Sequence, residues 1–276
     1  MRRGRLWLAL AVVAVGLVTY LGSRSENPTT GEVQSIALSP EQEIVLGLQS
    51  APHMAAEFGG LDPDSSVQSD IRELGERLVA ASAARDTPYQ YSFAVLADDQ
   101  TVNAFALPGG PVFITRALLA RLENEAQLAG ILGHEIGHVV GRHAAEQIAK
   151  SQLAQSLVTA VGIAAADEDS SGRGAAQMAA MAAQVVQLKY GRDDELQSDE
   201  LGVGIMADAG YDPRELAAVM AILARASGGG RRGPDFLASH PDPGDRAQRI
   251  AEAIARRFPQ GVPAQLTTGR PVRLGG

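Results

Sequence analysis

The stretch His134-Glu-Ile-Gly-His138 decides the fold, and it lies in an apolar sequence over residues 123–150 that favours a helix. At about 100° per residue, His134 and His138 stand about 40° apart on one helix face, so both imidazoles can reach one metal ion. Glu135 lies beside them, where its carboxylate can touch an attacking water and act as a general base. The chain has no cysteine, so any metal must be held by histidine and carboxylate. The stretch therefore predicts a hydrolytic site with one Zn2+ per chain.

A catalytic zinc needs a third protein ligand, which must come from elsewhere in the chain. His143 is one candidate, but on a helix that simply continues it lies about 180° round from His134 and faces away from the metal. The metzincin pattern HExxHxxGxxH does not fit either, because it needs histidine where this chain has Ala144. Glu195 and Asp199 are better candidates, since residues four apart point from one face of a second predicted helix. One can bind zinc while the other orients a ligand imidazole, although such a pair alone is usually a solvated helix face. Two neighbouring carboxylates are further alternatives: Asp194 and Glu200.

A further helix and a small sheet are predicted before the HEIGH stretch. Apolar positions at helical spacing run over residues 67–84, and Pro88 ends any helix soon afterwards. Three β-prone runs then predict a sheet of three or more strands, with the turn Pro108-Gly109-Gly110 between the last two. The three runs are residues 91–95, 102–106 and 112–115. From residue 123 onward the pattern is helical, with interruptions at residues 167–174, Gly210, residues 228–230 and Pro241.

The first 25 residues form a separate segment. Arg2, Arg3 and Arg5 precede an uncharged apolar run over residues 6–21, which would span about 24 Å as a helix. No A-x-A cleavage pattern follows the run, which favours an uncleaved anchor over a removed signal. Basic residues before the run favour a cytoplasmic N-terminus and an exported body.

The remaining chain divides into three further parts by composition. We expect a polar linker at residues 26–40 without packed structure, a catalytic domain at residues 41–260 and a tail at residues 261–276. The formal charge of −8 argues against a nucleic-acid partner, because phosphate binding needs a basic face. Protein or peptide partners are favoured instead.

Four stretches together resemble the HtpX-, BepA- and Oma-type zinc metallopeptidases, a family that also includes the CAAX prenyl endopeptidases. They run in the family's order over about 145 residues: 103–110, 134–138 with 142–143, 195–199, and 240–241 with 246. The resemblance implies an α+β, mostly α, gluzincin-type fold in which the HExxH helix and a small β-sheet lie beside the cleft. It implies Glu195 as the third zinc ligand and Asp199 as the partner of a ligand imidazole. It also implies that His240 and Arg246 face the active site.

Elementary chemistry gives these additional residues plausible roles. A cationic or hydrogen-bonding side chain aimed at the developing oxyanion stabilises the transition state, and His240 or Arg246 could supply it. In related proteins the corresponding histidine is able to approach the metal itself, so a self-inhibited resting state is an open alternative. Without the resemblance, His240 reads as an ordinary loop histidine beside a proline. A strand at the cleft edge can pair with an extended peptide through its main chain, and we expect it at Asn103, Ala104, Phe105 and Ala106.

Three functions are consistent with these features. The favoured one is a membrane-anchored or periplasmic zinc endopeptidase that degrades unfolded or damaged proteins of a bacterial cell envelope, as a protein quality-control enzyme. The alternatives are a chaperone or assembly factor whose zinc site is held closed, and a zinc hydrolase of a small amide. Only one run is long and apolar enough to span a membrane, so processing of prenylated membrane substrates is not expected. We expect a stand-alone catalytic domain, and the sequence names no recruiting partner.

Overall fold

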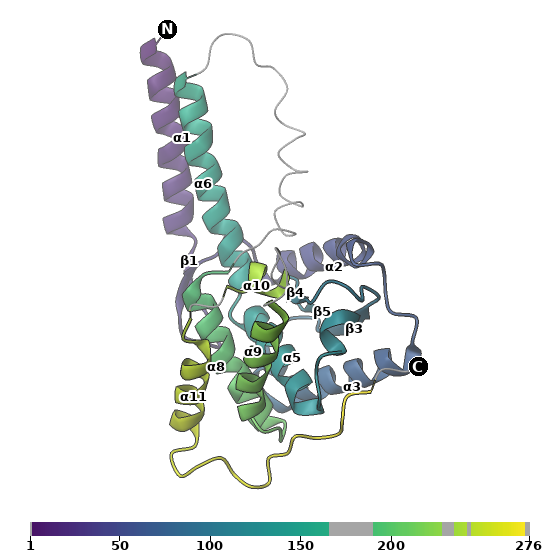
Figure 1. The fold of residues 1–276 in the computed structure, drawn as a ribbon. Helices are drawn as coiled ribbons and strands as arrows, with labels where there is room; N and C mark the ends of the chain where they lie inside the picture. Colours follow the sequence, from purple (N-terminus) through teal and green to yellow (C-terminus); the bar gives the residue numbers. More distant parts are fainter. Residues whose placement is uncertain (1, 166–189, 228–234, 242–243, 274–276) are drawn as a thin grey trace.

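The computed structural model describes residues 2–165, 190–227, 235–241 and 244–273, which form a mostly helical α+β fold (Figure 1). This fold class confirms the prediction, whereas the predicted interruptions at 167–174 and 228–230 lie outside the described residues. The helices are α1 (Arg2–Gly22), α2 (Pro40–Glu57), α3 (Ser65–Ala81), α4 (Arg116–Leu119), α5 (Glu125–Val140), α6 (His143–Ala165), α8 (Arg192–Asp208), α9 (Arg214–Ser227), α10 (Asp235–Ser239) and α11 (Arg246–Arg257), with a 3-10 turn at Ala83–Asp86. The strands are β1 (Arg24–Glu26), β2 (Val33–Ser35), β3 (Ser92–Leu96), β4 (Ala104–Ala106) and β5 (Pro111–Thr115).

The HEIGH stretch lies on α5, at the centre of the hydrophobic core. Asn124 caps this helix by accepting a hydrogen bond from the Gln127 backbone N–H at 2.9 Å. The helix packs closely against α8, and the glycine inside the motif makes this approach possible. A Cβ at Gly137 would lie 2.7 Å from the Ser198 Oγ and 2.9 Å from the Ser198 carbonyl oxygen. Glycine at this position therefore brings the carboxylates of α8 next to the histidines of α5.

The predicted sheet is present, with strand order β3-β5-β4. β3 pairs with β5 in parallel, and β4 pairs with β5 antiparallel, with Phe105 opposite Phe113. The turn between β4 and β5 contains Gly109 and Gly110, both with positive φ, as a tight turn requires. β4 is an edge strand of this sheet, so one of its main-chain edges faces away from β5.

The interval predicted as a linker contains packed structure, which corrects that expectation. β1 pairs antiparallel with β2, so residues 24–35 form a small hairpin. Its side chains reach the end of α5: the amide of Asn27 donates to the Val140 carbonyl at 2.9 Å, and that of Gln34 donates to the Gly141 carbonyl at 2.7 Å. Both amides are buried. The segment packs through polar groups, which an apolar-periodicity reading does not detect.

The helical region predicted over residues 123–150 is present, but it consists of two helices with a break between them. α5 ends at Val140, and α6 begins at His143 after a sharp change of direction. Arg142 adopts a left-handed φ of 57°, a conformation that costs a non-glycine residue on the order of 1–3 kcal/mol. Its guanidinium donates to the Glu43 carboxylate and, at 2.9 Å, to the Leu38 carbonyl, and these contacts hold the break.

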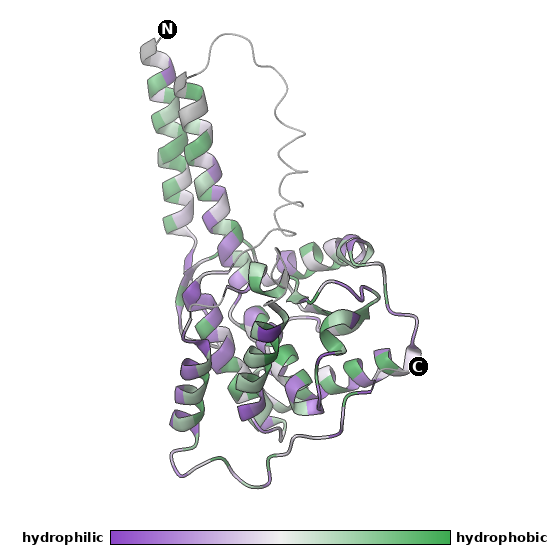
Figure 2. Ribbon diagram, viewed as in Figure 1, coloured by the Kyte–Doolittle hydropathy of each residue, from purple (hydrophilic) through white to green (hydrophobic). Residues whose placement is uncertain are grey.

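Helices α1 and α6 project side by side from the body of the molecule (Figure 1). Figure 2 shows that hydrophobic residues dominate α1 and the outer part of α6. Among the described residues, the one helix long and apolar enough to cross a membrane is α1, over Gly4–Gly22. Its large apolar side chains are mostly exposed, as in Trp7, 72% exposed.

Candidate metal centre

Four buried side chains from three parts of the chain meet beside α5. His134 and His138 come from α5, Glu195 from α8, and His240 from the end of α10, and their potential ligand atoms lie within 4.8 Å of one another. The Nε2 atoms of the two α5 histidines are 3.0 Å apart. His240 Nδ1 lies 3.3 Å from His134 Nε2 and 3.0 Å from Glu195 Oε1. Neighbouring donors of a tetrahedral zinc are about 3.3 Å apart, so these atoms fit one such ion.

The hydrogen bonding of the cluster also fits a cation. Glu135 is fully buried, and neither of its oxygens accepts a hydrogen bond from the described residues. The nearest side-chain nitrogen with which it pairs is His240 Nε2, at 3.6 Å, and this nitrogen also lacks a hydrogen bond. Burying ionised groups without partners is costly, so this set of donors is compatible with a positive ion that would satisfy them. Three nitrogens and one carboxylate oxygen are a donor set that suits zinc.

Glu135 lies next to β4, and its buried surroundings change its acidity. Burial raises its pKa, and this effect outweighs the lowering by His240 and His134. The backbone amide of Ala106 also lowers the pKa of Glu135, which indicates that β4 lies next to this carboxylate. A carboxyl with a raised pKa holds a proton more strongly, which favours proton transfer from an attacking water.

The outer nitrogen of His134 meets a charged network. Its Nδ1 lies 2.9 Å from Asp199 Oδ1, and Arg246 donates to both oxygens of Asp199, at 2.9 Å and 2.7 Å. Arg246 Nη1 is also 3.1 Å from Glu195 Oε2. Burial lowers the pKa of His134, but Asp199 and Glu195 outweigh it and raise the pKa to about 9. The local field therefore favours a positive charge at this histidine.

These contacts locate two residues whose roles were expected from the resemblance. Asp199 touches the outer nitrogen of His134, where it orients the imidazole so that Nε2 points into the cluster. Arg246 is 1% exposed and is engaged by the two carboxylates of α8. Its contacts support a positioning role, while the oxyanion role expected for it stays a prediction.

The outer nitrogen of His138 meets a neutral network. Its Nδ1 lies 2.8 Å from His143 Nδ1, and His143 Nε2 lies 2.6 Å from Gln197 Oε1. Burial lowers the pKa of both histidines, which favours the neutral form of both imidazoles. If His138 binds metal through Nε2, its Nδ1–H donates to His143, whose Nε2–H donates to Gln197. The ring of Tyr190 stacks on His138 with centroids 4.0 Å apart.

His143 reaches this position because α5 does not continue through it. The expectation that it faces away from the site assumed an unbroken helix, and the turn at Arg142 removes that assumption. Gly141 leaves room for the His143 ring, because a Cβ at residue 141 would collide with that ring. His143 does not belong to the four-residue cluster and instead lies behind His138.

The remaining candidates occupy separate places. Asp194 accepts hydrogen bonds from the Gly191 backbone N–H and from Gln147, both at 2.8 Å, at the start of α8. Glu200 is exposed and pairs with Arg256 at 2.9 Å. Neither belongs to the four-residue cluster. Sequence reasoning missed Tyr190, because a single aromatic residue ahead of a helix has no spacing that marks it.

A small cleft of about 90 Å³ connects the cluster to β4. Asn103, Phe105 and Ala106 line it together with Tyr190 and His240. The remaining lining residues are Met54, Glu57, Phe58, Leu107 and Ser239. The side-chain oxygen of Asn103 is buried and accepts no hydrogen bond from the described residues.

The main chain of β4 alternates between its partner strand and the cleft side. The Asn103 carbonyl accepts from the Thr115 N–H at 2.9 Å, and the Leu107 N–H donates to the Pro111 carbonyl at 2.8 Å. In an antiparallel pair this alternation turns the N–H and C=O groups of Ala104 toward the other edge. Ala106 follows the same rule, in agreement with its amide acting on Glu135.

The fold and the site together define a metallopeptidase with an HExxH helix and a carboxylate on a second helix. The chain belongs to peptidase family M48, whose family model matches residues 65–254, more than half of the chain. This membership confirms the family that the four sequence stretches resembled.

Similar proteins in bacteria and mitochondria carry peptidase names. The chain is 32% identical over 244 residues to the putative beta-barrel assembly-enhancing protease of Vibrio cholerae, covering 85% of this chain and 48% of that protein. It is 27% identical to the mitochondrial metalloendopeptidase OMA1 of Schizosaccharomyces pombe, covering 89% and 71%. It is 29% identical to the metalloprotease YcaL of Escherichia coli, covering 71% and 76%. The chain spans about half the length of the assembly-enhancing proteases it matches.

Proposed function

We propose that this chain is a zinc endopeptidase, held at a membrane by α1, that cuts extended segments of unfolded or damaged proteins in a bacterial cell envelope. The observation that carries the proposal is the fully buried Glu135 beside the histidines of α5 and next to β4. The similar proteins, which include a metalloendopeptidase and a putative beta-barrel assembly-enhancing protease, support peptide-bond cleavage and an envelope location.

Each residue of the cluster has a role in peptide hydrolysis. His134, His138 and Glu195 would hold the zinc, which when bound polarises the attacking water and the scissile carbonyl. Glu135 takes a proton from that water and later delivers it to the leaving amine, so one carboxyl acts as base and then as acid. His240 lies 3.6 Å from Glu135, where its imidazole can donate to the oxygen of the attacked carbonyl.

Substrate binding along β4 is the second part of the proposal. The main-chain groups of Ala104 and Ala106 that point away from β5 can pair with an extended peptide, as in strand addition. Asn103 adds a buried side-chain oxygen that can accept a hydrogen bond from a substrate N–H. Recognition through main-chain groups selects an extended, unfolded conformation rather than a particular sequence, which suits damaged proteins as substrates.

A closed zinc site is the second candidate function, and His240 favours it. Its Nδ1 lies 3.3 Å from His134 Nε2 and 3.0 Å from Glu195 Oε1, distances that are typical of two donors bound to the same zinc ion. This nitrogen can therefore fill the fourth position of a tetrahedral ion. A protein held in this state binds unfolded chains without cutting them, as a chaperone or assembly factor. Cleavage of casein by the zinc-loaded chain separates the two functions.

Glu135→Gln is the test of the proposed enzyme. Removing the base should lower casein cleavage by roughly 10³-fold or more while zinc content and folding are retained, because the glutamine has the same shape but takes no proton. The measurement is cleavage rate together with zinc content by atomic absorption. Glu123→Gln, an exposed residue just ahead of α5, is the control and should behave as the unmodified chain. Cleavage by Glu135→Gln at the unmodified rate contradicts the enzyme assignment, and a zinc-loaded unmodified chain that spares casein supports the closed-site function.

A further inference from the structure

The outer part of α6 lies at the same height as the candidate membrane span of α1. The two helices run in opposite directions, and a Cβ at Gly16 would lie 2.9 Å from the Ser156 Cβ and 3.6 Å from the Leu153 Cδ1. Counting from this contact at 1.5 Å per residue, Lys150 is level with Gly22, about 9 Å toward the body. Residue 165 is level with residue 7, about 14 Å the other way.

We propose that the outer part of α6, residues 153–165, lies in the same lipid bilayer as α1, so that two helices rather than one hold the catalytic body at the membrane. The proposal rests on the membrane role of α1 in the proposed function. If α1 crosses a bilayer, a helix packed against it over the same height cannot remain in water.

The surface chemistry of α6 changes along its length as this placement requires. Residues 156–165 contain no charged residue. Leu157 and Val158 are 43% and 64% exposed, and on α1 Val15 and Val18 are 66% and 71% exposed. Hydrophobic residues are therefore present on both helices at this height, as the colouring of the two ribbons in Figure 2 shows. An exposed apolar surface of this kind marks contact with a partner, and here the partner at that height is lipid.

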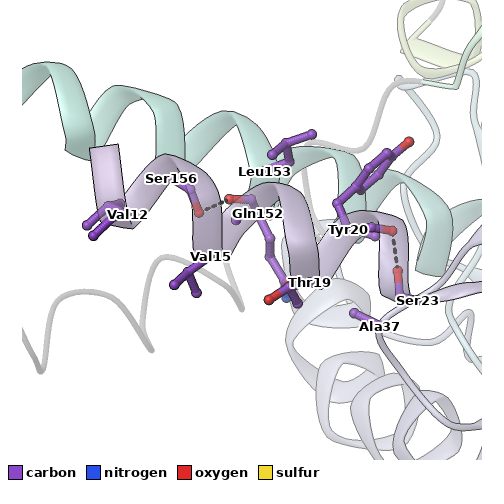
Figure 3. A pocket seen from close by; sticks show the side chains of 12 residues that line it. Val12, Val15, Thr19, Tyr20, Ser23, Ala37, Gln152, Leu153 and Ser156 are labelled. Atoms are coloured by element: carbon purple, nitrogen blue, oxygen red, sulfur yellow. Dashed lines mark hydrogen bonds between the residues drawn. The ribbon is translucent and has the colours of Figure 1, made fainter. Parts of the chain in front are cut away.

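Two hydroxyls beside the shared face are satisfied by nearby main-chain carbonyls. The Ser156 hydroxyl donates to the Gln152 carbonyl at 2.9 Å, and the Ser23 hydroxyl donates to the Tyr20 carbonyl at 2.9 Å (Figure 3). A hydrocarbon environment demands such internal pairing. The two helices approach through small residues, since Ala9 and Ala160 are both buried. Small residues at the contact are typical of helix pairs in membranes.

A groove of about 350 Å³ follows the seam between the two helices (Figure 3). Val12, Val15 and Leu153 line it, with Thr19 and Gln152 nearer the body. Its shape and apolar character suit a lipid acyl chain. At the body end, Lys150 is 42% exposed and pairs with Glu146 at 3.2 Å, a position from which its ammonium can reach lipid phosphates.

This placement fixes the distance between membrane and active site. α6 begins at His143, which touches His138, and Lys150 follows seven residues later, a rise of about 10 Å. The cleft would therefore act on chain segments that lie at the membrane surface, which narrows the substrate class of the proposed peptidase.

The test uses the absence of cysteine in the chain, which lets a single introduced cysteine carry a fluorophore. Val158→Cys on α6, Val18→Cys on α1 and Val45→Cys on α2 are all exposed positions. The full-length variants are labelled with an environment-sensitive dye and reconstituted into vesicles of phosphatidylcholine and phosphatidylglycerol. Quenching is measured with an acyl-chain nitroxide lipid and, separately, with aqueous iodide.

The expected result is that the labels at 158 and 18 lose most of their emission to the nitroxide lipid and little to iodide, while the label at 45 shows the reverse. A 158 label that behaves like the 45 label overturns the proposal. A 158 label shielded from both quenchers also overturns it, because protein then covers α6, either a second copy or another part of the chain. If iodide also quenches the 18 label, α1 does not lie in the bilayer and the membrane role proposed for it is contradicted. Casein cleavage by the same preparation then shows whether the peptidase assignment still holds.

Discussion

His134 and His138 stand one turn apart on α5, yet their outer nitrogens are held in opposite ways. The Nδ1 of His134 faces the Asp199 carboxylate at 2.9 Å, and the Arg246 guanidinium donates a hydrogen bond to the same carboxylate. The Nδ1 of His138 faces the neutral imidazole of His143 at 2.8 Å, and Gln197 completes that chain. The first arrangement, here called the charged side, contains ions, and the second, the neutral side, contains none.

The two sides perform different tasks at a metal centre: one stabilises a positive charge, and the other orients a ligand ring. On the charged side, buried ions raise the pKa of His134 to about 9 and favour a cation, but each ion must keep its partner to avoid a large desolvation cost. On the neutral side, no buried ion needs a partner, and the network only fixes the tautomer and the orientation of the His138 ring. Substitutions on the charged side should therefore affect folding and affinity strongly, and those on the neutral side weakly.

The largest effect is expected from Arg246→Ala, which removes the arginine that pairs with two buried carboxylates of α8 and leaves Asp199 without a cationic partner. Breaking a buried ion pair in this way should lower the free energy of unfolding by about 3–5 kcal/mol. Urea unfolding of the zinc-loaded chain measures it. Arg249→Ala on the same helix, where the side chain is 50% exposed, is the control and should change stability by less than about 0.5 kcal/mol. If both variants lost the same free energy of unfolding, the buried ion pairs of Arg246 would contribute nothing special to stability.

His240→Ala tests the residue whose ring lies against both α5 histidines, on the face opposite their outer nitrogens. As an oxyanion donor, His240 should contribute to the rate, so its removal should lower kcat for a fluorogenic peptide by roughly 10²–10³-fold, with zinc content retained. His53→Ala is the matched control, because His53 is an exposed histidine on α2. A rise in basal cleavage or in self-cleavage would instead make His240 a gate over the fourth zinc position. Unchanged activity would return it to an ordinary loop histidine.

The carboxylates of the charged side could be predicted from the sequence, whereas the neutral side could not. Glu195 and Asp199 are spaced at i and i+4, which places them on one face of any unbroken helix, and α8 runs without a break over Arg192–Asp208. His143 depends on the backbone of Arg142, whose left-handed φ is held by contacts with residues 38 and 43, about a hundred positions earlier. No local pattern contains that information, so a continuous helix was the natural expectation.

The same contrast explains the fold predictions. Strands and helices with strong apolar periodicity, such as α3 and the strands of the three-stranded sheet, fall close to their predicted ranges. The β1–β2 hairpin was missed because its amides at Asn27 and Gln34 bond to the end of α5 in place of apolar contacts. Arg246 was expected near the site, but its engagement by Asp199 is a tertiary contact that spacing cannot supply.

Asp199→Asn keeps the shape of the charged side but removes its charge. The zinc affinity should fall by about 10–100-fold, because the partner that orients His134 and strengthens it as a ligand becomes a weaker acceptor. Competition with a chromogenic chelator measures the dissociation constant. Asp193→Asn, an exposed carboxylate on the same helix, serves as the control. An affinity that is the same for both variants would show that the charge of Asp199 does not act on the metal.

The smallest effect is expected from His143→Ala on the neutral side, and it tests whether His143 and Gln197 act as one chain. The variant should bind one zinc per chain with affinity lowered about tenfold, at the low end of what an outer partner contributes. Glu195→Ala, by contrast, should lose the metal, because it removes a proposed ligand. Since Gln197 acts only through His143, the double variant His143→Ala, Gln197→Ala should lose no more affinity than His143→Ala alone. His143→Asn should recover part of the loss, because its amide oxygen can accept the His138 Nδ1–H. Additive losses, or no recovery by asparagine, would mean that His143 only fills space behind His138, and loss of zinc stoichiometry in His143→Ala would make it a ligand.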